Sequence, residues 1–70
     1  MILKQVITTE NGIHEWYIEG KNFYIEPNKD DFTSVFVKVD ENVGLYNLDL
    51  SNSEIFILND NGKTIDRVMR

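Results

Sequence analysis

Two glycine-containing turn signals divide the first third of the chain into three runs of strand-forming residues, and they constrain the fold more than any other sequence feature. Asn11-Gly12 lies between the runs Ile2–Thr9 and Ile13–Glu19. Gly20-Lys21 precedes a third run, Asn22–Glu26. Asn-Gly favours a two-residue type I′ turn, and glycine at the first central position favours a type II′ turn; both join adjacent antiparallel strands. The segment is therefore predicted to form a three-stranded antiparallel meander.

The first turn also determines which residues share a face of this meander. With Asn11 and Gly12 at the centre of a type I′ turn, Ile7 lies opposite Trp16, and opposite residues share a face. An alternative is a type I turn over Thr9–Gly12 with Gly12 in a bulge, which shifts the first strand by one residue and inverts its faces. The type I′ turn is preferred, because the alternative puts Ile7 opposite a glutamate. The predicted core face then holds Leu3, Ile7, Trp16, Ile18, Phe23 and Ile25, and the other holds Val6, Tyr17 and Tyr24 with a Lys4–Glu19 ion pair.

The rest of the chain has the same strand-and-turn organisation. The valines of Val35–Val39 alternate with Phe36 and Lys38, which is the period of a half-buried strand. Gly44 is expected to adopt a positive φ in the loop before the next strand. Asn59–Gly62 predicts a hairpin, formed either by a type I turn with a glycine bulge or by a two-residue Asn-Gly turn. Four further strands are predicted: Thr33–Val39, Leu45–Leu50, Glu54–Leu58 and Lys63–Val68.

These patterns predict one all-β domain over residues 1–70, a small antiparallel barrel or sandwich of six to seven short strands. The chain contains no alanine and no cysteine, so helix formers are scarce and no disulfide can stabilise the fold. Neither a membrane-spanning apolar run nor a signal peptide is recognisable, so we expect a cytoplasmic protein. The composition, rich in Ile, Asn, Lys and Asp, is typical of AT-rich genomes such as those of many bacteria and phages.

The charge is negative and uneven. The net charge is −5, and residues 1–62 carry four lysines against eleven carboxylates, whereas residues 63–70 are net positive. An acidic body repels phosphate backbones and attracts basic surfaces. The charge thus argues against non-specific DNA binding and favours a basic protein partner.

The sequence offers little for catalysis. His14 is the single histidine and cysteine is absent, so one chain cannot supply a Cys/His zinc site. The paired acids Asp30-Asp31 and Asp40-Glu41 are adjacent residues in polar loops, whereas two-carboxylate catalysis needs groups held across a cleft. Asn59–Gly62 lacks the spacing of a calcium loop. We therefore expect a non-enzyme with no metal and no cofactor.

Aromatic residues are the other candidates for binding. In the meander, Tyr17 and Tyr24 lie side by side, with Lys21 at the end of the pair. If that face is open, they form a platform, and tyrosine is enriched at protein interfaces and stacks on nucleic-acid bases. If it is covered, they belong to a second core layer. Phe36, on the face of its strand opposite the three valines, is a further candidate.

One stretch resembles a known family. Lys21-Asn-Phe-Tyr-Ile-Glu-Pro27, an acidic loop and Val35-Phe-Val-Lys-Val39 resemble the two nucleic-acid-binding strands of cold-shock domains over about 20 of the 70 residues. That family shows Lys-Gly-Phe-Gly-Phe-Ile and Val-Phe-Val-His-Phe. Here Asn22 and Tyr24 replace both glycines, and Ile25 and Val39 replace phenylalanines. The resemblance implies an OB-like barrel that binds single-stranded nucleic acid.

Three function hypotheses follow. The first is a small acidic module, an inhibitor or adaptor, that binds a protein with a basic surface; in a sharper form its acidic loops Asp30-Asp31 and Asp40-Glu41 mimic nucleic-acid phosphates. The alternative is single-stranded nucleic-acid binding through Tyr17, Tyr24, Phe36 and Lys21. The third is a structural homo-oligomer whose open sheet faces or edges pair between subunits. No membrane association is expected in any of them.

Overall fold

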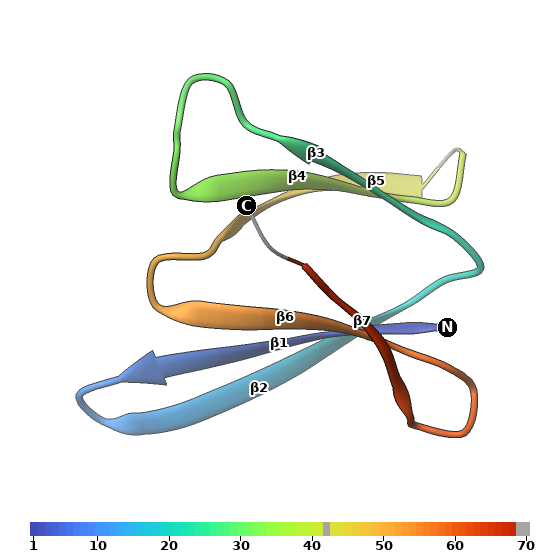
Figure 1. Cartoon of the computed structure of the whole chain (residues 1–70), viewed down its shortest axis with the longest axis horizontal. Coiled ribbons are helices and arrows are strands. Elements are labelled where there is room, and N and C mark those ends of the chain that lie inside the picture. Colours follow the sequence, from blue (N-terminus) through green and yellow to red (C-terminus); the bar gives the residue numbers. More distant parts are fainter. Residues whose placement is uncertain (42, 69–70) are drawn as a thin grey trace.

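The computed structural model describes residues 1–41 and 43–68 and confirms an all-β fold (Figure 1). Seven strands form in the described residues, close to the predicted runs. They are β1 (Ile2–Thr9), β2 (Gly12–Glu19), β3 (Phe23–Pro27), β4 (Ser34–Val39), β5 (Val43–Asp49), β6 (Ser53–Leu58) and β7 (Thr64–Val68). No helix capable of crossing a membrane is found among the residues described.

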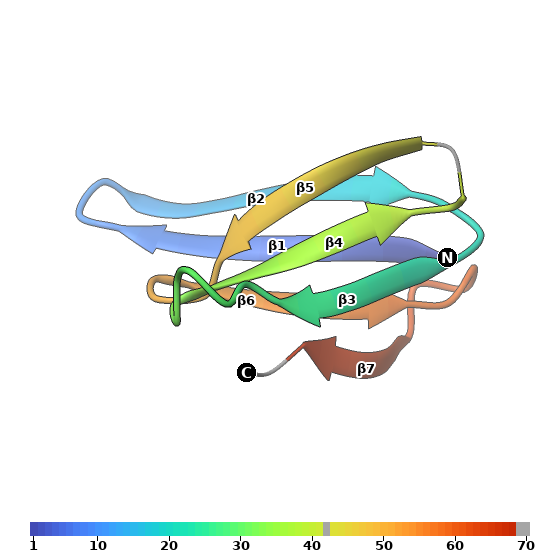
Figure 2. The ribbon, with the colours of Figure 1, turned by 90° about the horizontal axis from the view of Figure 1, so that it is seen from above.

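The strands form two stacked antiparallel sheets. One has the order β2-β1-β6-β7 and the other the order β3-β4-β5. Figure 1 shows the three-stranded sheet above the four-stranded sheet, and Figure 2 shows β5 lying over β2 at one side of the stack. Of the two predicted architectures, the sandwich is correct, because no strand pairing between described residues closes the sheets into a barrel.

The core lies between the sheets and follows the alternation of the sequence. In β4 the three valines are buried, as predicted, while Phe36 is half-buried and Lys38 exposed on the outer face. Burying these apolar side chains is the main stabilising term for such a fold. The buried residues are Leu3, Val35, Val37, Val39, Leu48, Ile55, Ile57 and Val68, and Trp16, Ile18, Phe23, Ile25 and Leu50 pack against them.

The first hairpin forms, but its turn is not the preferred type I′ turn. Its φ angles fit the alternative, a type I turn over Thr9–Gly12 with Gly12 at positive φ, although the pairing register is one residue away from the one that alternative predicts. Thr9 pairs with Gly12, so Gln5, and not Ile7, lies opposite Trp16. Gly12 has a φ of 123°, whereas Asn11 has no positive φ and therefore cannot belong to a type I′ turn. The hydroxyl of Thr9 accepts the Asn11 N–H at 3.2 Å and donates to the Gly12 carbonyl at 3.2 Å, which stabilises the observed turn.

The pairing register is shifted by two residues from the preferred prediction. Because side chains alternate with a period of two, this shift keeps every residue on its predicted face. It does change neighbours: Lys4 is opposite Tyr17 and forms its ion pair with Glu15, at 3.6 Å, in place of the predicted pair with Glu19.

The predicted meander is wrong at its third strand, because β3 pairs with β4 in the other sheet. The segment between β2 and β3 is a crossover between sheets and not a type II′ hairpin turn. A Cβ atom at Gly20 would lie 2.6 Å from Cγ1 of the buried Val39, so glycine is needed for close packing. Gly20 has no positive φ. Gly20 therefore marks a close approach of the crossover to β4, and not a hairpin turn.

A positive φ was expected at two later glycines, and the structure confirms it at Gly62 but not at Gly44. Gly62 has a φ of 81° and its N–H donates to the Asn59 carbonyl at 3.0 Å, which fits the predicted type I turn with a glycine bulge. Gly44 has no positive φ, contrary to the prediction. Asp40 has the left-handed conformation at that end of β4, with a φ of 53°. Aspartate tolerates it because its short polar side chain can bond locally.

Candidate functional site

The four edge strands of the sandwich differ in how they are protected. β3 is five residues long and ends at Pro27, which has no N–H to offer a new strand. β7 is equally short, and its pairing with β6 shifts register between Ile57 and Leu58. Short strands, proline and irregular pairing are the usual means of preventing edge-to-edge association.

β2 lacks all three protections. β5 lacks two of them, because its pairing with β4 also shifts register, between Lys38 and Val39. They contain eight and seven residues, respectively, without proline, lysine or arginine. No described strand pairs with the outer edge of either one. Long unprotected edges present a row of unpaired N–H and C=O groups, which is a template for pairing with another chain.

The two unprotected edges lie on the same side of the sandwich, which we call the β2/β5 side (Figure 2). The rings of Trp16 on β2 and Tyr46 on β5 bridge the sheets there, with centroids 6.3 Å apart and planes inclined by 50°. Two aliphatic side chains on these strands remain largely in solvent, Ile13 with 67% and Leu45 with 66% of its surface exposed. The β2/β5 side therefore combines open backbone with exposed apolar side chains.

The predicted aromatic platform does not form. Tyr17 lies on the outer face of the four-stranded sheet, and Tyr24 on the outer face of the three-stranded sheet, because β2 and β3 belong to different sheets. Both are exposed. Lys21 lies in the crossover between them. The prediction failed with the meander on which it rested.

The structure does bring Tyr24 and Phe36 together on one outer face. Tyr24 is opposite Lys38, and Phe36 is opposite Glu26, so the two rings are diagonal neighbours on paired strands. A shallow hollow of about 590 Å³ beside them is lined by Tyr24, Glu26, Lys38 and Glu41. With two carboxylates and one ammonium group at this hollow, the local charge does not favour an anionic ligand.

The two acidic loops lie at opposite ends of β4. Asp30 and Asp31 are in the β3–β4 loop, and Asp40 and Glu41 begin the connection from β4 to β5. A six-residue strand is roughly 20 Å long at about 3.4 Å per residue. The structure thus separates the two predicted acidic groups.

Local hydrogen bonds fix both loops. In the first, Asn28 is buried, and its side-chain carbonyl accepts the Asp30 N–H at 3.0 Å. The carboxylate of Asp31 accepts the N–H and the hydroxyl of Thr33 at 2.9 and 2.7 Å. In the second, one carboxylate oxygen of Asp40 accepts the N–H groups of Lys21 and Asn22, at 3.0 and 2.8 Å. Asp40 therefore holds the crossover to β4, a structural role that its position in a polar loop did not indicate.

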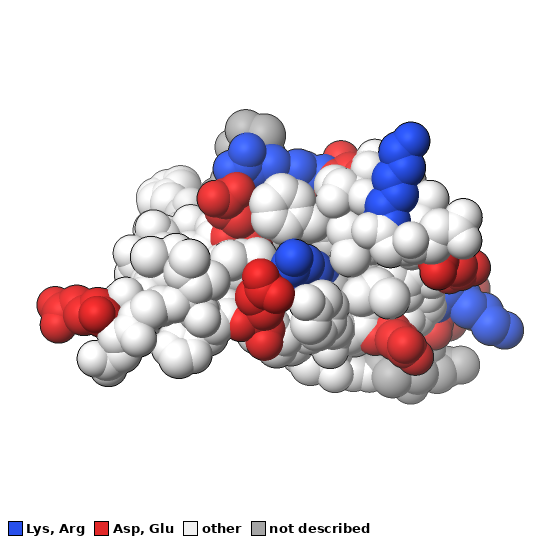
Figure 3. Space-filling model, turned by 90° about the horizontal axis from the view of Figure 1, so that it is seen from below, with Lys and Arg blue, Asp and Glu red and all other residues white. Residues whose placement is uncertain are grey.

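The outer face of the four-stranded sheet carries a row of alternating aromatic and cationic side chains. Tyr17, Lys4, Phe56 and Arg67 are opposite one another across the four strands. The guanidinium carbon of Arg67 lies 5.8 Å from the centroid of the Phe56 ring. Figure 3 shows this face, with basic and acidic side chains interspersed on a largely uncharged surface.

Carboxylates beside this row neutralise its cations. Arg67 contacts Glu54 at 3.0 Å and Lys4 contacts Glu15 at 3.6 Å. The Tyr17 hydroxyl donates to the other oxygen of Glu15 at 2.9 Å, and this hydrogen bond raises the pKa of Tyr17 above its ordinary value of 10.0. The face is thus charge-balanced and has no concentrated positive patch for a phosphate.

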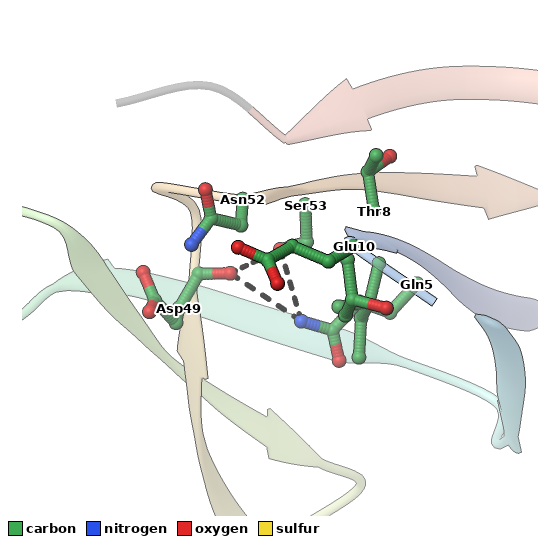
Figure 4. A pocket seen from close by; sticks show the side chains of 8 residues that line it. Gln5, Thr8, Glu10, Asp49, Asn52 and Ser53 are labelled. Carbon is green, nitrogen blue, oxygen red and sulfur yellow. Dashed lines mark hydrogen bonds between the residues drawn. The ribbon is translucent and has the colours of Figure 1, made fainter. Parts of the chain in front are cut away.

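Gln5 is a polar core residue that the sequence reasoning missed. It is 4% exposed, and its amide nitrogen donates to the Asp49 carbonyl at 3.3 Å and to the Ser53 hydroxyl at 3.1 Å (Figure 4). These bonds tie β1 to the β5–β6 connection at the floor of a cavity of about 460 Å³. A glutamine between Leu3 and Ile7 in an alternating run was the available signal.

No catalytic or metal-binding constellation is found in the described residues. His14 is exposed on β2. No three His, Asp or Glu side chains of residues 1–41 and 43–68 converge on a point that could hold a metal ion. No known family model, curated protein or solved structure matches the chain. Function must therefore be argued from the surfaces described above.

Proposed function

We propose that this chain is a small acidic protein-binding module without catalytic activity, acting as an inhibitor or adaptor of a protein with a basic surface. The observation that carries the proposal is the β2/β5 side, where two long unprotected edge strands lie together with exposed apolar side chains. Exposed strand edges are typical of sites at which another chain pairs, and Ile13 and Leu45, on the outer faces of the two sheets, add exposed apolar surface at this side. The net charge of −5 favours encounter with a basic partner.

The sharper phosphate-mimic form of this proposal receives less support from the geometry. The two acidic loops are at opposite ends of β4, and Asp40 is engaged in holding the crossover. A phosphate mimic would lose affinity for its partner when Asp30, Asp31 and Glu41 are changed to the corresponding amides. Unchanged binding by this triple variant would eliminate the mimic and leave the edge-strand proposal intact.

The proposal is tested by capture from a bacterial lysate on the immobilised chain, with and without nuclease treatment, followed by mass spectrometry. A protein retained after nuclease treatment, and competed by the free chain, is the expected result. An Ile13→Lys variant provides the comparison, because it places a charge on the exposed edge without touching the buried core. Absence of any nuclease-resistant protein would contradict the proposal.

A second candidate is single-stranded nucleic-acid binding, favoured by the placement of Tyr24 and Phe36 on one outer face; the carboxylates of Glu26 and Glu41 there oppose it. Base stacking on an aromatic side chain contributes about 1–3 kcal/mol, so Tyr24→Ala would weaken oligonucleotide binding by that amount. Tyr17→Ala is the matched control, because Tyr17 lies on the other sheet and its loss should have no effect. Absence of oligonucleotide binding at low salt would remove this candidate.

A homo-oligomer is the third candidate, since the same edges could pair between copies of the chain. Sedimentation equilibrium over a range of concentrations distinguishes it. A strictly monomeric mass would eliminate this candidate and leave the β2/β5 side available for another protein.

A further inference from the structure

β2 has the features of a template for an added strand. Its outer-face residues are Ile13, Glu15, Tyr17 and Glu19, and its inner-face residues include His14, Trp16 and Ile18. A strand paired with its free edge would place successive side chains beside these two sets in turn. In such strand addition, main-chain hydrogen bonds provide affinity, and the alternating side chains provide specificity.

The charges along β2 indicate which kind of strand fits. Glu15 and Glu19 are exposed on the outer face, with Tyr17 between them. Glu15 forms an ion pair with Lys4, whereas Glu19 has no ion pair or side-chain hydrogen bond in the described part of the chain. Opposite charges across a strand pair stabilise it and like charges destabilise it. A strand with basic residues beside Glu15 and Glu19 therefore complements this edge.

A second copy of the chain complements it less well. Antiparallel pairing of β2 with itself places Glu15 opposite Glu15 in one register and opposite Glu19 in another. The register centred on Trp16 avoids both, as do the shorter overlaps centred on His14 and Ile18, but each still brings together two bodies of net charge −5. Like net charges oppose association, whereas a basic segment is attracted at long range.

We propose that β2 binds an extended segment of a partner protein by antiparallel strand addition, with Lys or Arg beside Glu19 and Glu15 and an apolar or aromatic side chain beside Tyr17. This inference rests on the proposed protein-binding function and specifies its site and its partner chemistry. The partner segment carries its basic residues four positions apart, on the face shared with Tyr17. Its alternate side chains cover Trp16 at the β2/β5 side.

Trp16 is the single tryptophan, so its fluorescence reports directly on this site. The probe is the capped peptide Lys-Val-Tyr-Val-Lys-Thr-Ile, whose residues would lie opposite Glu19 through Ile13. A saturable change in Trp16 emission is expected, and its affinity should fall as salt is raised. The charge-reversed peptide Glu-Val-Tyr-Val-Glu-Thr-Ile is the peptide control and should not bind.

Two variants with the same charge change locate the site. Glu19→Lys should weaken binding of the basic peptide by about tenfold, equivalent to 1.4 kcal/mol. Glu26→Lys, on the outer face of β3 in the other sheet, should leave the affinity unchanged. Equal weakening by both variants would mean that only the net charge matters and would overturn the inference. Absence of a saturable signal in the wild-type chain would also overturn it.

Repeating the lysate capture with Glu19→Lys separates this inference from the function on which it rests. Loss of the captured protein with Glu19→Lys, but not with Glu26→Lys, supports strand addition at β2. Capture that is unaffected by Glu19→Lys leaves a protein-binding function and overturns the β2 site. A stable dimer that Glu19→Lys or Ile13→Lys dissociates would show that a second copy occupies the edge, and would overturn the inference as well.

Discussion

The two sides of this sandwich differ in how far their edge strands are protected from pairing with another chain. On one side, β3 ends in proline, and β7 is short with a register shift against β6. On the other side, β2 and β5 are longer, contain no proline, lysine or arginine, and carry the exposed Ile13 and Leu45; of the two, only β5 has a register shift, against β4. A chain of 70 residues can thus protect an edge, so the unprotected side calls for a functional explanation.

The largest effect is expected at Gly20, where the chain passes from the unprotected β2 edge to the protected β3 edge. Gly20→Ala would push a methyl group into Val39, and overpacking of this kind costs about 1–3 kcal/mol of unfolding free energy. Urea denaturation measures the change. Gly44→Ala is the milder control, because its Cβ would lie 3.3 Å from the Tyr46 ring. Equal effects at both positions would contradict close packing as the reason for Gly20.

A second prediction concerns Asp40, which holds that same crossover. Asp40→Ala removes the acceptor for two backbone N–H groups and the tolerance of a positive φ, a loss of about 1–2 kcal/mol. Asp30→Ala removes an exposed loop carboxylate and should change stability by less than about 0.5 kcal/mol. Thermal unfolding of both variants tests whether the two acidic loops differ as the structure indicates.

The β7 edge offers a smaller test. Arg67→Ala removes the ion pair with Glu54 and the contact with the Phe56 ring, and should cost about 0.5–1 kcal/mol. Lys63→Ala deletes a nearby cation that has no such contacts with the described residues, and it should be nearly neutral. Loss of most of the Arg67 contribution at high salt would indicate that the ion pair, and not stacking, dominates.

Two substitutions that have little effect on stability should remove the protection of the β3 edge and add protection to the β2 edge. Pro27→Val restores an N–H to the β3 edge, and Ile13→Lys adds a charge to the β2 edge; each should change unfolding free energy by less than about 0.5 kcal/mol. We expect Pro27→Val to increase self-association in light scattering and Ile13→Lys to reduce any that the wild-type chain shows. The opposite ranking would mean that proline and charge do not control these edges.

The smallest predicted effect is a titration on the β2 edge. The hydrogen bond to Glu15 raises the pKa of Tyr17, so the neutral tyrosine is favoured in the folded chain. This contribution to stability is fully present below pH 10.0, the ordinary value, and is lost as pH rises through the higher folded-state value. Phenolate absorbance, with Tyr17→Phe for assignment, measures it. Glu15→Gln should lower the pKa of Tyr17, and Glu19→Gln should not.

Local sequence signals identified the elements and the faces of this protein with little error. Val35, Val37 and Val39 were placed in the core from their alternation, and Leu3 and Trp16 from theirs. The assignment of side chains to the two faces of β1 and β2 was correct even though the predicted hairpin register was wrong by two residues, because a shift of two preserves the alternation. The seven strands were found because turn residues and β-branched runs act over short distances.

The candidate surfaces depended on information that is not local. Gly20 marks a turn in the sequence, but only tertiary packing against Val39 decides that the chain crosses to another sheet there. That crossover separates Tyr17 from Tyr24, moves Tyr24 beside Phe36, and brings the edges of β2 and β5 to one side. The sequence by itself determined strands, turns, inner faces and net charge, since these depend on neighbours along the chain. Which strands pair, and therefore which edges stay open, was decided by the tertiary structure, because many pairings of seven similar strands satisfy the same local alternation.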